Sequence, residues 1–484
     1  MGLTSESLKQ KTVKGVTWTF TEQVLTRGVN FLIGIILARL LSPTDYGLVG
    51  MLGIFLTISQ TLINGGLTSA LIQTKNPSDK DFSTVYIVNL VLSFVFYGIL
   101  FVLAPAIANF YDQPLLKPLL RVISLILIIG ALSSVHGTKL SIRLDFKTKT
   151  YISFIASVFS GVVGIVCAYK SMGVWALAAQ SIASSIAITI LSLLFLRWIP
   201  RLEFSKESFK RLFGFSSKIL ASCLINDIYS GSYALVIGKR FSPSDLGQYS
   251  RAGQFPGIAN GTIMGALDKV AYPVLSKVQD DDALLIRVYD KYIQFSCFII
   301  FPILLGICGC ARPMVSLLLT DKWLPCVPFM QILCFAFLTE CITKINLNLL
   351  FVKGRSDFVL RLEIIKKIIA FSILFISMFF SLKVMCYGQV LNAFIALYLN
   401  THYTKKILGY SFGKQIKSVY PYFLISLIVL VEALFSSTLI HNNWVSLAVS
   451  VTVGGISYFL LSKLFRLYAA QEAEGYIKQF LCRA

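Results

Sequence analysis

The chain has 484 residues, of which 56% are hydrophobic and 14% are charged, and its formal net charge at pH 7 is +21. About a dozen apolar stretches approach the ~20 residues that a membrane-spanning helix needs. This composition excludes a soluble globular protein, and no polar stretch is long enough to form a separate water-soluble catalytic domain. The sequence therefore predicts an all-α, polytopic membrane protein.

Fourteen spans are predicted, and short loops connect them. They cover residues 15–39, 47–72, 83–107, 119–141, 151–169, 173–196, 214–238, 247–275, 292–311, 325–351, 360–382, 384–403, 419–440 and 445–465. The first run lacks the cleavage pattern of a secretory signal, so we interpret it as a retained span. The eighth contains Arg251, Asp268 and Lys269. Such residues can face a bundle interior or a water-filled cavity.

The distribution of lysine and arginine over the loops predicts how the protein is oriented in the membrane. With the N-terminus inside, the alternate loops and tails on the cytoplasmic side collect 32 of the 44 basic residues. This bias matches the positive-inside rule and predicts that both termini are cytoplasmic. The net charge is then mostly a topology signal together with contact to anionic membrane lipids, and it does not favour a nucleic-acid partner.

A hexapeptide repeat divides the chain. SPTDYG at residues 42–47 returns as SPSDLG at residues 242–247. Six spans separate the two copies, so the copies run in the same direction and predict two parallel six-helix bundles. We expect bundles at 1–200 and 201–410, followed by two additional helices and a tail at 411–484. The serine, proline and aspartate of each copy resemble a capping box that starts the second and the eighth helix.

Polar residues follow one face of the first span and the matching face of the seventh. The first stripe contains Glu22, Gln23, Thr26, Arg27 and Asn30, and the second contains Ser222, Cys223, Asn226, Asp227 and Ser230. Lipid would reject both stripes, so we expect them to line a central cavity that binds substrate.

Arg27 is the residue of these stripes whose insertion into the membrane is least favourable. An arginine at mid-membrane depth costs about 2.5 to 3.5 kcal/mol on insertion scales. Arg27 could bind an anionic substrate group such as a diphosphate through a bidentate contact, or form a structural ion pair with Glu22 or Asp227. Glu22, Asp227 and Asp268 are possible ion-coupling sites. Glu340 and Lys344, four residues apart, have the spacing of a structural ion pair.

Other chemistry is not indicated. The ten cysteines are scattered through apolar segments and the three histidines lie in separate segments, so neither a disulfide framework nor a metal site has the right spacing. No glycine-rich phosphate loop and no catalytic grouping of Ser, His, Cys or Asp is present. We therefore expect neither a cofactor nor enzymatic activity.

Several motifs resemble one family. They are ARLLSPTDYG at 38–47, GGLTSALIQ at 65–73, GVWAL at 173–177, GQYSRA at 247–252 and YPVLS at 272–276. With them, residues 10 to 410 resemble polysaccharide flippases of the Wzx type, in the multidrug/oligosaccharidyl-lipid/polysaccharide exporter superfamily. The last two spans match only in being apolar.

The resemblance implies two six-helix bundles around a cationic cavity. It also implies transfer of an undecaprenyl-diphosphate-linked oligosaccharide to the outer leaflet of the bacterial cytoplasmic membrane by alternating access. Arg27 matches a cavity arginine of related flippases, whereas Asp227 stands where a second base would strengthen anion binding. A polysaccharide polymerase and a chain-length regulator are possible partners.

Three alternatives remain open. A drug/cation antiporter of the same superfamily would use deep carboxylates such as Glu22, Asp227 and Asp268. A peptidoglycan-precursor flippase would have the same number of spans. An O-antigen polymerase or ligase would be expected to carry a large outer loop, and here the predicted outer loops are about ten residues or shorter.

Overall fold

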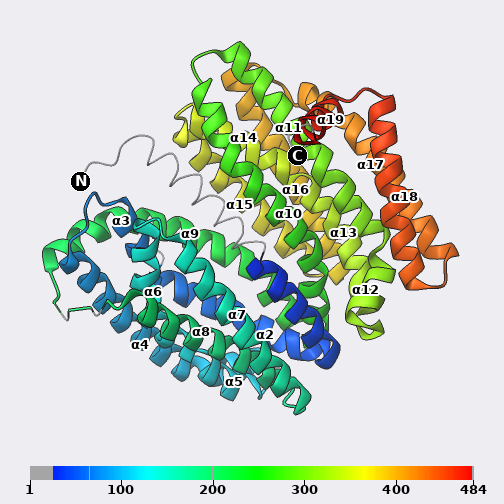
Figure 1. Ribbon diagram of the computed structural model, residues 1–484. Coiled ribbons are helices and arrows are strands. Elements are labelled where there is room, and N and C mark those ends of the chain that lie inside the picture. Colours follow the sequence, from blue (N-terminus) through cyan, green and yellow to red (C-terminus); the bar gives the residue numbers. More distant parts are fainter. Residues whose placement is uncertain (1–24, 65, 199, 202, 482–484) are drawn as a thin grey trace. The chain divides into compact units, whose positions relative to one another are not determined.

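A computed structural model of the chain describes all residues except 1–24, 65, 199, 202 and 482–484. All regular secondary structure in the described residues is helical (Figure 1). The predicted all-α fold is confirmed. Cα packing divides the chain into two compact units, residues 1–247 and 248–484.

The first unit contains a helical stretch at residues 25–40, followed by eight further helices. These are α2 (Pro43–Asn64), α3 (Leu67–Gln73), α4 (Asp79–Phe110), α5 (Leu116–Ile123), α6 (Leu125–Ile142), α7 (Phe146–Tyr169), α8 (Val174–Leu196) and α9 (Lys206–Arg240). The first turn of the next helix, α10 (Pro243–Lys277), also belongs to this unit.

The second unit contains the rest of α10 and nine further α-helices. They are α11 (Asp282–Gly309), α12 (Ala311–Leu319), α13 (Val327–Leu338), α14 (Glu340–Val352), α15 (Ser356–Ser377), α16 (Leu382–Leu408), α17 (Phe412–Leu439), α18 (Asn443–Leu464) and α19 (Tyr468–Leu481). A short 3-10 helix, η1 (Asp321–Cys326), precedes α13. The predicted division at residues 200 and 410 follows the sequence repeat, and it stays a prediction.

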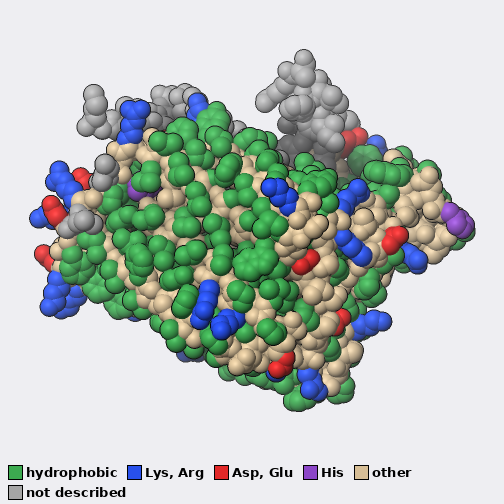
Figure 2. Space-filling view, turned by 90° about the horizontal axis from the view of Figure 1, so that it is seen from below, with side chains coloured by type: hydrophobic (Ala, Val, Ile, Leu, Met, Phe, Trp, Pro, Cys, Tyr) green, Lys and Arg blue, Asp and Glu red, His purple; other side chains and the backbone are tan. Residues whose placement is uncertain are grey.

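Eleven helical segments of the described chain are long and apolar enough to cross a membrane. Each of the fourteen predicted spans falls on one helix or on consecutive helices, although the first one begins in residues outside the described part. Three predicted spans are not among these eleven segments. The first begins outside the described residues, and the other two lie on α10, which is more polar, and on α15, whose first half is charged. Figure 2 shows hydrophobic side chains over most of the displayed face, as expected for a protein surrounded by lipid.

Both hexapeptides form the predicted helix caps. The Ser42 amide donates to Asp45 Oδ2 at 2.9 Å, and the Asp45 amide donates to Ser42 Oγ at 3.3 Å. Ser242 and Asp245 repeat the exchange, with both distances at 3.1 Å. Reciprocal bonds of this kind satisfy amides that have no partner within the helix. The prediction that these residues start α2 and α10 is confirmed.

The two capped helix starts also cross each other inside the first unit. A Cβ atom added to Gly47 would lie 1.7 Å from the carbonyl oxygen of Pro243, and one added to Gly247 would lie 1.9 Å from that of Pro43. Because each glycine has no side chain, the backbone of the other repeat can approach it closely. Any larger residue at either position would force the two helices apart.

α9 packs antiparallel along α2. Added Cβ atoms at Gly238 and Gly231 would approach the side chains of Met51 and Ile54 within 2.9 and 2.5 Å, and one at Gly66 would lie 2.7 Å from Ser216 Cβ. Residue numbers rise along α2 as they fall along α9. Small residues bring helices into close contact where lipid provides no hydrophobic drive for association.

A buried amide pair joins four helices of the second unit. Asn346 Nδ2 of α14 donates to Gln415 Oε1 of α17 at 3.1 Å, and Gln415 Nε2 donates back to Asn346 Oδ1 at 3.2 Å. The hydroxyls of Tyr289 in α11 and Thr404 in α16 donate to the same Asn346 oxygen, each at 2.6 Å. Because all four residues are buried, these bonds fix the register of the helices.

Candidate functional site

The predicted cavity residues that the structure describes all lie in the first unit. Asn226, Asp227 and Ser230 occupy the middle of α9, and Thr26, Arg27 and Asn30 lie in the helical stretch at 25–40. Glu22 and Gln23 lie outside the described residues, and so does the side chain of Asp268.

Asp227 has a defined partner in α2. The Thr61 hydroxyl donates to Asp227 Oδ2 at 2.5 Å. Asp227 lies one helical turn before Gly231, where the close approach to Ile54 holds α9 against α2. This hydrogen bond restrains the Asp227 side chain. Our prediction considered Arg27 as the partner of Asp227 and did not identify Thr61.

Polar contacts continue next to Thr61. Asn64 lies one turn further along α2, and its Oδ1 accepts from Asn89 Nδ2 of α4 at 3.4 Å. The same Asn89 nitrogen donates to Ser134 Oγ of α6 at 3.1 Å. We call Thr61, Asn64, Asn89, Ser134 and Asp227 the polar cluster. Its hydrogen bonds connect α2, α4, α6 and α9 within spans that are otherwise mostly apolar.

Other predicted cavity residues are accessible within this unit. Arg27, Asn30, Asn226 and Ser230 are exposed, whereas Asp227 is half-buried. The Thr26 hydroxyl is enclosed and makes no hydrogen bond to a described residue. Exposed polar groups on helices that must cross lipid require an aqueous or protein environment. That these faces line a substrate cavity stays a prediction.

One ion pair joins the beginning of α9 to α4, and a second joins α6 to α4. Arg211 Nη2 lies 2.6 Å from Asp81 Oδ1 at the start of α4, and Lys139 Nζ of α6 lies 3.1 Å from Asp79 Oδ1. Lys139 is almost fully buried, and its Nζ lies 3.8 Å from the centre of the Trp198 ring. Trp198 belongs to the connection between α8 and α9. The aromatic ring and the carboxylate together compensate for burial of this cation.

The second unit contains the remaining candidate pair. Lys344 Nζ lies 3.8 Å from Glu340 Oε2 in α14, and Asn260 Nδ2 of α10 donates to the same oxygen at 2.6 Å. Asn260 therefore links the predicted i, i+4 pair to a second helix.

Four residues of the polar cluster were not predicted from the sequence. Thr61, Asn64, Asn89 and Ser134 occur singly in apolar runs, where a small polar residue commonly bonds to its own helix. A polar side chain at membrane depth indicates a position that faces the bundle interior, but it does not show which residue is its partner.

Comparisons with known proteins agree with this architecture. Residues 36–328 match the model of a family described as polysaccharide biosynthesis protein. The succinoglycan biosynthesis transport protein ExoT of Rhizobium meliloti is 29% identical, over 70% of this chain and 69% of its own length. The lipopolysaccharide biosynthesis protein WzxC of Escherichia coli is 25% identical, over 88% of this chain and 87% of its own length.

Solved structures show the same fold. The lipid II flippase MurJ in an inward closed conformation superposes with a TM-score of 0.76, covering 94% of this chain and 98% of its own, at 14% identity. An inward-facing multidrug resistance transporter of the MATE family superposes with a TM-score of 0.63 at 16% identity, covering 80% and 94% of the two chains. Because the family model matches more than half of the sequence, the chain belongs to the polysaccharide biosynthesis protein family of multi-pass membrane proteins.

Proposed function

We propose that this protein is a flippase that moves an undecaprenyl-diphosphate-linked oligosaccharide from the inner to the outer leaflet of a bacterial cytoplasmic membrane. The oligosaccharide would be a repeat unit of lipopolysaccharide, capsule or exopolysaccharide. The observation that carries the proposal is the exposed polar face of the first unit, with Arg27, Asn30, Asn226 and Ser230 on helices that otherwise suit lipid. A sugar needs hydrogen-bonding groups along its path, and a diphosphate needs a cation such as Arg27.

The family membership supports a carbohydrate cargo, and the names of ExoT and WzxC place both relatives in polysaccharide biosynthesis. In this proposal the protein works by alternating access, with both termini in the cytoplasm, and hands its cargo to a polymerase and a chain-length regulator. It transports the lipid-linked sugar without enzymatic change.

The test is the sidedness of the lipid-linked sugar after deletion of the gene. We expect the intact undecaprenyl-linked repeat unit to accumulate in the cytoplasmic leaflet, where an impermeant glycosidase added to spheroplasts does not cleave it. A polymerase deletion in the same strain is the control, since it should leave the sugar accessible from outside. Accumulation in the outer leaflet after deletion of this gene would contradict flipping and favour a polymerase.

Asp227 is proposed as an ion-coupling residue. We expect Asp227→Asn, which keeps the shape and removes the charge, to slow polysaccharide export about tenfold, because the Thr61 hydroxyl would then donate to a neutral amide oxygen, a weaker acceptor than a carboxylate. Export by the variant should also lose its dependence on the ion gradient across the membrane. Export rates at several external pH values and sodium concentrations provide the measurement.

Thr61→Val is the matched variant for this experiment. It removes the hydroxyl that donates to Asp227 Oδ2 and leaves the carboxylate in place. We expect slower export that still responds to the gradient. If Asp227→Asn exported normally with an unchanged gradient dependence, the coupling role would be rejected while the flippase proposal would stand.

A further inference from the structure

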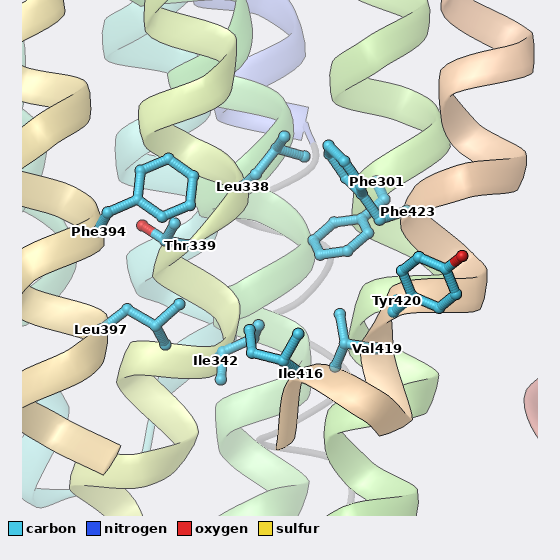
Figure 3. A pocket seen from close by; sticks show the side chains of 10 residues that line it. All are labelled: Phe301, Leu338, Thr339, Ile342, Phe394, Leu397, Ile416, Val419, Tyr420 and Phe423. Atoms are coloured by element: carbon cyan, nitrogen blue, oxygen red, sulfur yellow. The ribbon is translucent and has the colours of Figure 1, made fainter. Parts of the chain in front are cut away.

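The second unit contains an apolar groove of about 260 Å³ among α11, α13, α14, α16 and α17. Figure 3 shows side chains from these helices pointing toward one space. Phe301, Leu338, Ile342, Leu397 and Val419 form its floor, and each is at least nine-tenths buried. Phe394 and Tyr420 form its rim and are exposed by 49% and 54%. The groove therefore opens on the surface of the second unit.

The groove offers almost no polar group to a ligand. Thr339 contributes a hydroxyl, but this hydroxyl already donates to the Ala336 carbonyl within its own helix at 3.1 Å. The Tyr420 hydroxyl points away from the space in Figure 3. An apolar slot with exposed rims, on helices that cross the membrane, suits a hydrocarbon chain.

Positive charge lies at one end of this groove. Lys405 and Lys406 are exposed in the last turn of α16, and Lys414 and Lys417 are exposed in the first turns of α17. Lys417 directly follows the groove residue Ile416, and Lys405 is eight residues from Leu397, or about 12 Å along a helix. The positive-inside rule assigns these lysines to the cytoplasmic surface.

The buried amide pair lies at the same end. Gln415 adjoins Ile416, and Asn346 is one turn beyond Ile342. The groove residues of α17 extend from Ile416 to Phe423, about 10 Å along the helix, which fits within one leaflet of about 15 Å. A chain that entered near the lysines would thus lie along the groove toward the middle of the bilayer.

We propose that the groove binds an acyl chain of an anionic phospholipid from the cytoplasmic leaflet, with its headgroup phosphate on Lys414 and Lys417. The lysines favour an anionic headgroup over a zwitterionic one, because the choline cation of a zwitterionic headgroup offsets the charge of its phosphate. In this proposal the exposed rim faces the surrounding bilayer, and the occupant is a membrane phospholipid rather than the transported sugar lipid. The site is a lipid-binding site apart from the polar cluster.

Retention of lipid by the purified full-length protein tests the proposal. The probes are phosphatidylglycerol and phosphatidylcholine with identical acyl chains, added in detergent and measured by native mass spectrometry. We expect phosphatidylglycerol to be retained preferentially. The double variant Lys414→Gln/Lys417→Gln should lower its retention roughly tenfold. Lys383→Gln is the matched control, because Lys383 is exposed at the opposite end of α16, and it should retain lipid normally.

Two groove variants test the chain site separately. Val419→Phe adds volume to the floor, and Ile416→Trp adds it at the exposed rim, where misfolding is least expected. We expect both to reduce retention of phosphatidylglycerol. Equal retention of both phospholipids, or retention unchanged in every variant, would overturn the proposal. Displacement of phosphatidylglycerol by undecaprenyl diphosphate would overturn it too, because the groove would then belong to the transported lipid. None of these readouts depends on transport.

Discussion

Replacing Gly47 by alanine is expected to destabilise the protein by about 1–3 kcal/mol, the usual cost of overpacking, and to reduce polysaccharide export accordingly. The new Cβ atom would lie 1.7 Å from the Pro243 carbonyl oxygen, and backbone atoms at this distance must move. The first turns of α2 and α10 would separate. Thermal unfolding of the purified protein in detergent measures the loss of stability.

Gly53→Ala is the matched control, since it makes the same change on the same helix and nothing lies within 4 Å of its added Cβ atom. Gly247→Ala should behave like Gly47→Ala because it opens the same crossing from the other side. The double variant should cost less than the sum of the two single changes, as expected for residues in direct contact. Equal stability of the Gly47 and Gly53 variants would show that the crossing is not required.

Replacing Arg27 by alanine is expected to abolish detectable surface polysaccharide while the protein is still produced and inserted. Arg27 is the exposed cation of the helical stretch at 25–40, and losing a charge-assisted bond costs about 1.5–3 kcal/mol, or roughly ten- to a hundredfold in affinity. Polysaccharide on intact cells, normalised to the amount of protein in the membrane, provides the measurement.

Two variants separate the role of the charge from general damage. Arg27→Lys retains a cation but loses the bidentate geometry, so we expect partial export. Lys117→Ala removes an exposed cation on the predicted outer surface and should export normally. Wild-type levels of polysaccharide with Arg27→Ala would reject the role given to Arg27 in substrate binding.

Local patterns were sufficient to predict much of this molecule. Helix caps such as Ser42 with Asp45 involve residues three apart, so their bonds follow from short-range geometry. Spans follow from the length of apolar runs, because every backbone amide in lipid must be bonded within its own helix. Where polar and apolar residues mix, as in α10, composition does not establish whether a helix spans the membrane.

The candidate site depended on contacts that no local pattern contains. Asp227 and Thr61 are 166 residues apart, and they meet because Gly231 and Gly238 allow α9 to lie against α2. The hexapeptides identified a repeat, but the reciprocal crossing of Gly47 and Gly247 required the positions of both helices. The groove beside Val419 likewise arises from five separate helices.

The sequence by itself thus determined the membrane class, the helices, their caps and the polar faces, because hydropathy, periodicity and capping act over a few residues. The tertiary structure alone decided that Thr61 is the partner of Asp227, that Asn346 and Gln415 bond to each other, and where an apolar groove remains open. The physical reason is that lipid accepts any apolar helix face equally well. Close packing of small residues and long-range hydrogen bonds therefore select which faces meet.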